Sequence, residues 1–181
     1  MVHIILYGEE NVVMGKSILN EYKRDKAVEY AHKWAFKRNP AYFSFDNFGG
    51  DCTNFVSQAI FAGTGVMNYT PVYGWYYIDS YRRTPSWTGV EFLYKFLVTN
   101  QGPGPIGERA DIKDIMPGDI VQLSFNKELG FTHSMIIVET GISKDYNNIL
   151  ICAHTYDRDN YPLSSYNWSD IRFIHITGVR K

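Results

Sequence analysis

Hydrophobic residues recur at helical spacing in three segments of the first half of the chain. The first segment spans residues 24–38 and stops at Asn39-Pro40, and the second runs from Cys52 to about Gly63. A third helix is expected to begin near Thr88, because Glu91 three residues later completes a capping box. The buried faces of the three predicted helices comprise Ala27, Tyr30, Ala31, Trp34 and Ala35, then Phe55, Val56, Ala59 and Ile60, then Phe92, Leu93, Phe96 and Leu97.

The second half of the chain carries short β-rich runs, which follow a break at Gly102-Pro103-Gly104-Pro105. The runs are bounded by turn residues and cover residues 119–124, 132–140, 149–155 and 171–177. A further short strand is expected at residues 2–7. Helices followed by strands predict an α+β fold, in which the helical half packs on an antiparallel sheet of four or five strands.

Composition limits the classes of partner. The chain has 181 residues, of which 45% are hydrophobic, so it can form the core of one domain. The formal charge of −1 gives no electrostatic reason to expect nucleic acid or an anionic membrane. No run approaches the roughly 18 apolar residues that a membrane span needs. The N-terminal residues lack the features of a signal peptide, so we expect a cytoplasmic protein as synthesised, and the oligomeric state stays open.

The most informative motif is Gly49-Gly50-Asp51-Cys52. It places Cys52 in the first turn of the second predicted helix, where unpaired N–H groups and the helix dipole favour the thiolate over the thiol. The thiolate is the nucleophilic form of cysteine, so Cys52 is a candidate nucleophile. A small buried core residue is the alternative interpretation. A disulfide with Cys152 is conceivable, but it would consume this nucleophile.

Two histidines lie at the ends of neighbouring predicted strands. His133 begins one strand, and His154 lies near the end of the next. If these strands pair as an antiparallel hairpin, the two histidines are neighbours at one edge of the sheet. Such a pair would supply a general base and a residue that orients it. Taken singly, each histidine is more simply explained as a residue that ends a strand.

Four segments of the chain occur together in one known family: Gly50-Asp51-Cys52-Thr53-Asn54-Phe55-Val56-Ser57-Gln58, Pro117-Gly118-Asp119, His133-Ser134 and Ala153-His154-Thr155. They resemble the putative amidase domain family, which is related to the NlpC-type, papain-like cell-wall cysteine peptidases. The resemblance spans about residues 24–177, and the first twenty or so residues match nothing in it. We therefore expect one papain-like domain at residues 23–181 after an N-terminal extension at residues 1–22.

The resemblance implies a thiol hydrolase that cleaves amide bonds, commonly in peptidoglycan peptides. It assigns Cys52 as the nucleophile, His133 as the base and His154 as the third member of the triad. Asp157 is the rival for the third role, because a carboxylate also orients an imidazole. Attack by the sulfur would give a thioester that water hydrolyses, with the backbone N–H of Cys52 as an oxyanion donor. A peptidoglycan substrate would require release or export by a route other than a signal peptide.

Two other classes of function are compatible with the same residues. A thiol acyltransferase would use an acceptor other than water, and only a product assay separates it from a hydrolase. A non-catalytic cell-wall or peptide-binding module would keep the fold alone. The presence of both a nucleophile and a base argues against the second class.

Residues 69–87 hold five tyrosines and two tryptophans without regular spacing. A loop of this length and composition suits a substrate wall, in which Trp75 and Trp87 would cover a sugar or peptide chain. Packing of these rings over the helices explains the composition equally well. Asp51 adjoins the nucleophile and is a further candidate for substrate contact, although holding the loop or capping the helix is its more ordinary role.

Neither a nucleotide nor a metal is expected. Residues 8–17 end like a phosphate-binding loop, but Glu10 stands where that motif needs glycine. A zinc site can be assembled on paper from His133, Cys152, His154, Asp157 and Asp159. None of the usual ligand spacings supports such a site, so we expect no metal and no other cofactor.

Overall fold

The computed structural model describes residues 19–181, so the expected strand at residues 2–7 and the motif at residues 8–17 lie outside the described residues. The helices are α1 (Arg24–Trp34), α2 (Cys52–Thr64), α3 (Pro85–Thr88) and α4 (Val90–Thr99). The strands are β1 (Gly104–Ala110), β2 (Ile120–Ser124), β3 (His133–Glu139), β4 (Leu150–Ala153), β5 (Arg158–Pro162) and β6 (Asp170–Arg180). Two short 3₁₀ helices, η1 (Lys127–Leu129) and η2 (Leu163–Ser165), lie between strands. The described chain is α+β, as predicted.

Within residues 19–181 the strands form one six-stranded antiparallel sheet in the order β1-β6-β2-β3-β4-β5. The prediction of four or five strands was therefore too low, because it omitted β1 and β5. Both are edge strands, which pair on one side only and need no continuous hydrophobic run. β1 begins at Gly104, inside the Gly-Pro segment that marked a break, and β5 is polar along most of its length.

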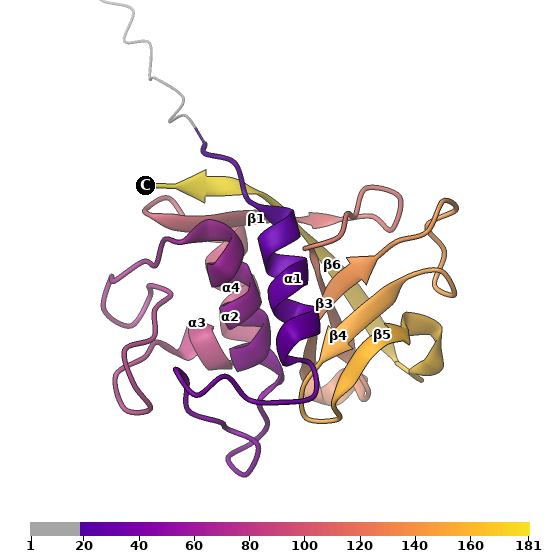
Figure 1. Cartoon of the computed structure of the whole chain (residues 1–181), viewed down its shortest axis with the longest axis horizontal. Coiled ribbons are helices and arrows are strands. Elements are labelled where there is room, and N and C mark those ends of the chain that lie inside the picture. Colours follow the sequence, from indigo (N-terminus) through magenta and orange to yellow (C-terminus); the bar gives the residue numbers. More distant parts are fainter. Residues whose placement is uncertain (1–18) are drawn as a thin grey trace, which may run out of the picture.

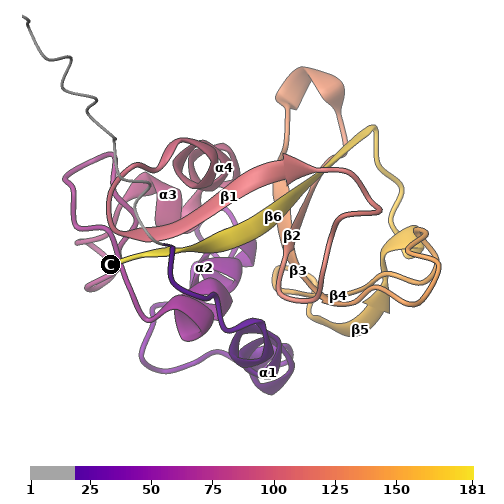
Figure 2. The same ribbon diagram turned by 90° about the horizontal axis from the view of Figure 1, so that it is seen from above.

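The helices cover one face of the sheet. Figure 1 shows α1 beside β3 and β4, and Figure 2 shows the helices on the left of the view with β2, β3, β4 and β5 on the right. Small residues on α1 and α2 bring both helices close to the sheet, where their common core comprises Ala31, Ala35, Phe55, Ala59, Ile136, Val138 and Cys152. No helix among the described residues is long and apolar enough to cross a membrane.

The end of α1 and the start of α4 differ from the prediction. α1 ends at Trp34 rather than at residue 38. The predicted capping box at Thr88 was wrong, because Thr88 ends α3 and Gly89 precedes α4 without any side-chain cap. Glu91 accepts a hydrogen bond from Arg172 at 3.1 Å instead. α2 matches its predicted span and ends before Gly65, whose φ of +63° suits a left-handed cap.

The Pro117-Gly118-Asp119 turn has a structural role. The Asp119 carboxylate is fully buried and accepts hydrogen bonds from Arg24 at 2.6 Å and from the N–H of Ile176 at 2.9 Å. It also lies 2.7 Å from Nδ1 of His175. The turn therefore fastens the start of α1 to β6.

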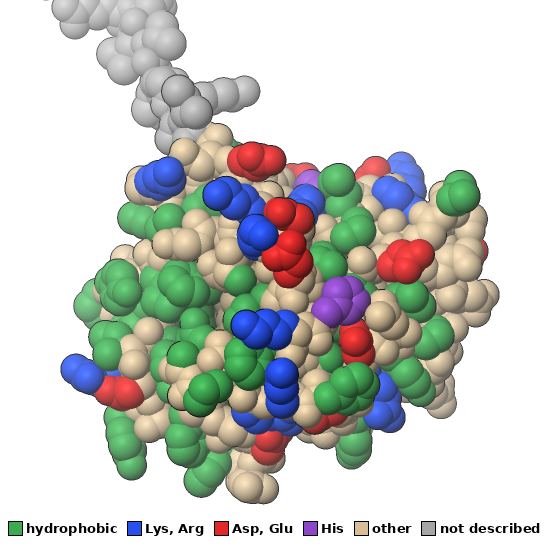
Figure 3. Space-filling view, in the orientation of Figure 1, with side chains coloured by type: hydrophobic (Ala, Val, Ile, Leu, Met, Phe, Trp, Pro, Cys, Tyr) green, Lys and Arg blue, Asp and Glu red, His purple; other side chains and the backbone are tan. Residues whose placement is uncertain are grey.

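The aromatic segment at residues 69–87 divides into an inner and an outer set. Trp75 and Trp87 are fully buried with ring centroids 4.7 Å apart, so the packing explanation holds for both. Their indole N–H groups donate to Ser57 at 3.1 Å and Asn54 at 2.9 Å, both on α2. The outer set, Tyr69, Val72, Tyr73, Ile78 and Tyr81, is exposed. Figure 3 shows hydrophobic side chains gathered on the left of the view, the side on which Figure 1 places α3.

Replacing Trp75 with alanine is therefore expected to destabilise the fold by about 3–5 kcal/mol, because it empties a closed aromatic site. Tyr73→Ala is the matched control, because Tyr73 is 84% exposed and its loss should change stability by less than about 0.5 kcal/mol. Denaturant unfolding of both variants measures the difference. Equal stability of the two variants would show that Trp75 is not a core residue.

Candidate active site

A turn at two consecutive glycines precedes the start of α2. Gly49 and Gly50 have φ values of +95° and +106°, a conformation that side chains rarely adopt. A Cβ on Gly50 would also lie 3.0 Å from the hydroxyl of Thr155. That hydroxyl accepts a hydrogen bond from the N–H of Asp51 at 3.0 Å. Thr155 itself has a φ of +80°, which is costly for a β-branched residue and keeps its hydroxyl at the turn.

The Asp51 carboxylate fixes this turn rather than facing solvent. One oxygen, Oδ1, accepts hydrogen bonds from the N–H of Phe45 and from the amide of Asn54, both at 2.8 Å. The other oxygen, Oδ2, lies 2.7 Å from Nδ1 of His154. Asp51 is 1% exposed, so it holds the loop, and it presents no surface to a substrate in this structure.

His154 is committed to structural contacts through both ring nitrogens. Nδ1 pairs with Asp51, and Nε2 donates to the backbone carbonyl of Trp34 at 2.9 Å. Its ring also stacks on Phe55, with centroids 3.9 Å apart. The predicted antiparallel pairing of β3 with β4 is confirmed, through Ile136 opposite Cys152. Both ring nitrogens of His154 are nevertheless engaged by Asp51 and Trp34, so neither is available to hold the ring of His133 in this structure.

Cys52 is the first residue of α2 and is largely buried. Its sulfur lies 3.8 Å from the hydroxyl of Thr53. That hydroxyl donates to Ser134 at 3.1 Å, and Ser134 in turn accepts from the amide of Gln122 at 3.0 Å. Thr53 follows Cys52 and Ser134 follows His133, so this hydrogen bond fastens the start of α2 to the start of β3.

His133, at the first position of β3, packs against two aromatic rings that also contact each other. The ring centroids of Phe125 and Tyr166 are 6.2 Å and 5.9 Å from that of His133. Among the described residues no group forms a hydrogen bond with Nε2 of His133, although this nitrogen is buried. A buried unpartnered nitrogen is costly in a folded protein and marks a site that can receive a proton or a ligand group.

The charge states of the two groups differ from the sequence-based expectation. Burial raises the pKa of the Cys52 thiol, and hydrogen bonds from the backbone of Ser134 and from Thr53 oppose this only in part. Burial also lowers the pKa of His133 to about 4. The helix N-terminus was expected to favour the thiolate, but removal of water outweighs it here. Near neutral pH both groups are uncharged in this structure.

Tyr166 lies near both His133 and Cys52, and sequence reasoning missed it. Its hydroxyl is buried and, within residues 19–181, has no hydrogen-bond partner. Burial raises the pKa of Tyr166 to about 12, and Cys52 is one of the groups that contribute to the rise. Tyr166 follows η2, some thirty residues after His133, and no motif in the sequence connected it with the site.

The remaining predicted site residues lie elsewhere. Asp157 accepts two hydrogen bonds from Arg38, at 2.8 Å and 3.1 Å, so the carboxylate proposed as a rival third member is paired with a cation. Trp75 and Trp87 belong to the core and do not form an exposed wall. Cys152 is free, as is Cys52, so the disulfide alternative is wrong for this structure.

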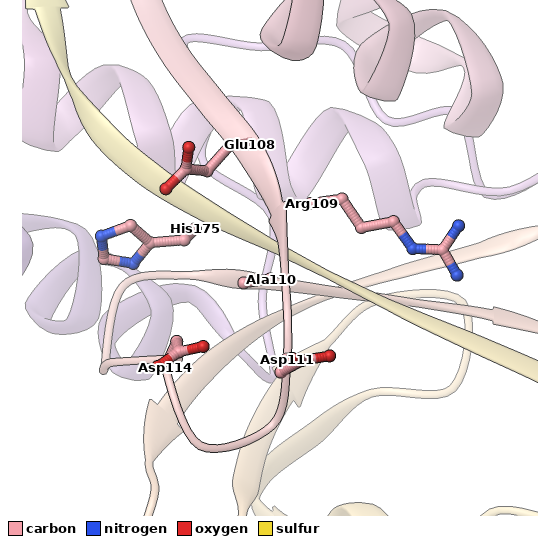
Figure 4. Close-up of a pocket in the computed structure, with 6 residues that line it drawn as sticks. All are labelled: Glu108, Arg109, Ala110, Asp111, Asp114 and His175. Atoms are coloured by element: carbon pink, nitrogen blue, oxygen red, sulfur yellow. The ribbon is translucent and has the colours of Figure 1, made fainter.

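A separate groove of about 580 Å³ lies along the edge strand β1. It is lined by Glu108, Arg109, Ala110, Asp111, Asp114 and His175. Figure 4 shows Glu108 and His175 on one side of the strand and Arg109 on the other, so these side chains do not converge. The ring of His175 is already engaged with Asp119. The groove contains neither thiol nor any of the residues around Cys52, and we do not assign chemistry to it.

Comparison with known proteins gives the family. Residues 21–177 match the model of a family described as a putative amidase domain. The uncharacterized protein YhbB of Bacillus subtilis (strain 168) is 37% identical over 153 residues, which cover 82% of this chain and 46% of that protein. The chain thus spans about half the length of this curated relative. No solved structure matches the chain. Because the family model covers most of its length, the chain belongs to the putative amidase domain family.

Proposed function

We propose that this protein is a thiol hydrolase that cleaves amide bonds, with Cys52 as nucleophile and His133 as base. Membership of an amidase-like family suggests hydrolysis of an amide. The observation that carries the proposal is the Thr53–Ser134 hydrogen bond of 3.1 Å, because it fastens the helix turn of Cys52 to the strand start of His133. The unpartnered Nε2 of His133 supports the role of a base.

The arrangement fits a papain-like enzyme of the NlpC type. A cysteine opens a helix that packs on an antiparallel sheet, and a histidine begins a strand of that sheet. The first backbone N–H groups of α2 have no acceptor within the helix. The N–H of Cys52 is therefore available to an oxyanion that forms next to its sulfur.

The reaction would start from a neutral pair. In the mechanism we propose, a bound amide brings its carbonyl carbon to Sγ of Cys52, and His133 accepts the thiol proton as the carbon–sulfur bond forms. The amine leaves with that proton, which gives a thioester on Cys52. Water, deprotonated by His133, then releases the acid and restores the thiol. The buried hydroxyl of Tyr166 is a second candidate donor to the oxyanion.

The third position of the triad needs a different assignment from the one expected. His154 contacts Asp51 and Trp34, and Asp157 contacts Arg38. We propose that His154 acts at a distance, by holding Asp51 and thereby the turn before Cys52. The ring of His133 would then be oriented by packing against Phe125 and Tyr166.

A peptide, in the first instance from peptidoglycan, is the substrate class that we propose. Two exposed aromatic rings support this class. Phe48 lies directly before the glycine turn, and Phe125 packs beside His133. Such rings suit a chain that carries polar groups and apolar faces. These residues replace Trp75 and Trp87 as the proposed contacts.

Cys52→Ala is expected to lower hydrolysis by on the order of 10⁴-fold or more, and His133→Ala nearly as much, because the two residues act as a unit. Digestion of purified peptidoglycan, with the new amine and carboxyl ends identified by mass spectrometry, measures this loss. Ile142→Ser, in the exposed turn at the far end of β3, is the control that should keep wild-type activity. Retained activity in Cys52→Ala would refute the proposal. Transfer of the acyl group to an amine, in place of hydrolysis, would assign the protein as an acyltransferase.

The pH dependence follows from the neutral pair. His133 loses its function as a base only when it is protonated, so kcat/KM should decline near pH 4 rather than near the ordinary histidine value of about 6.5. Because burial raises the pKa of Cys52, its alkylation by iodoacetamide should continue to accelerate through pH 9. Mass spectrometry of labelled peptides across a pH series measures the second effect. An alkylation rate that levels off below pH 7 would instead indicate a thiolate–imidazolium pair.

A further inference from the structure

Three side chains that the proposed reaction does not use converge at a second place in the fold. His32 from α1, Cys152 from β4 and Asp159 from β5 each offer one ligand atom, and these atoms lie within 4.8 Å of one another. Nδ1 of His32 is 2.6 Å from Oδ1 of Asp159, and the sulfur of Cys152 is 3.0 Å from the same oxygen. The sulfur and Nδ1 are 3.8 Å apart. These residues come from three elements that are distant in sequence.

We propose that His32, Cys152 and Asp159 form a Zn²⁺ site that is separate from Cys52 and His133. Tetrahedral zinc with bonds of about 2.0–2.3 Å holds its ligand atoms about 3.3–3.7 Å apart. The sulfur–nitrogen separation is already close to that spacing. The Asp159 oxygen lies nearer to both partners than the spacing requires, so it would have to move outward by several tenths of an ångström.

The side chains differ in their freedom to make that adjustment. Cys152 is fully buried on β4 and supplies a fixed sulfur. The side chains of His32 and Asp159 are 37% and 24% exposed, so both have room to shift and an ion can reach them from solvent. The same opening leaves the fourth coordination position to water. The arrangement is thus three protein ligands around an accessible point.

The chemistry of the ligands selects the ion. A thiolate and an imidazole favour Zn²⁺ over Ca²⁺ or Mg²⁺, which prefer oxygen ligands. Without the ion, the Cys152 thiol donates to Asp159. Binding replaces the sulfur–hydrogen bond with a sulfur–zinc bond and releases one proton to solvent. The thiolate and the carboxylate together then balance the two charges of the ion.

Such an ion would join α1 to the β4–β5 edge of the sheet. α1 contacts both strands, and Figure 1 shows its lower end beside β4. α1 also ends at Trp34, whose carbonyl holds His154 and through it Asp51. A ligand that binds only the folded state stabilises it by mass action. The site would therefore have a structural role and would support the turn before Cys52 indirectly.

Titration of the chelator-treated, reduced protein with Co²⁺ tests the site through its spectrum. Binding to Cys152 should produce a sulfur-to-cobalt charge-transfer band together with the visible bands of tetrahedral cobalt, and Zn²⁺ should displace both. Cys152→Ala should remove the charge-transfer band and weaken binding by more than about 100-fold, because even changes outside the ligand shell cost about 10–100-fold. Cys52→Ala should leave the spectrum unchanged.

Two further variants make the result decisive. His32→Gln changes a partly exposed side chain, and it should weaken Co²⁺ binding while its melting temperature in EDTA stays that of the wild type. Asp157→Asn removes a carboxylate two residues from Asp159 that pairs with Arg38, and it should bind Co²⁺ normally. The proposal is overturned if no charge-transfer band forms at millimolar Co²⁺. It is equally overturned if the band is lost in Cys52→Ala and kept in Cys152→Ala.

Discussion

The buried pair formed by Asp51 and His154 is the interaction on which the candidate site depends. Both side chains are 1% exposed, and together they join the loop before α2, the first turn of α2, the end of α1 and the residue after β4. Removing one partner from a buried pair generally costs about 3–5 kcal/mol, because the other is left without compensation. The position of Cys52 is therefore fixed by a contact between residues a hundred positions apart in sequence.

The two proposed catalytic side chains lie on elements that are hydrogen-bonded to each other, and burial keeps both side chains uncharged. The Thr53–Ser134 hydrogen bond fastens α2 to the sheet, where Gln122 holds Ser134 from the neighbouring strand, and burial keeps Cys52 and His133 neutral. A neutral pair avoids the cost of placing two ions in a closed site before substrate is present. The buried Nε2 of His133 is instead left without a hydrogen-bond partner, which is unfavourable until it accepts the thiol proton during the reaction.

Sequence reasoning predicted the features that depend on local pattern. The helix that begins at Cys52, the antiparallel pairing of β3 with β4 and the α+β class follow from periodicity, turn residues and chain order. It missed β1 and β5, because edge strands need no hydrophobic run. It also misjudged the charge of Cys52, which depends on burial. The contact of His32 with Cys152 joins residues 120 positions apart, and no spacing rule indicates such a pair.

In the proposed mechanism the acyl group of a cleaved amide passes through the sulfur of Cys52. Rapid acid quenching during turnover of an activated peptide ester, followed by peptide mapping with mass spectrometry, detects this acyl-enzyme. We expect an acyl adduct on the peptide that contains Cys52, and we expect it to decay at the rate of product release. Turnover with Cys52 unmodified throughout, or an adduct on another residue, would rule out Cys52 as the nucleophile.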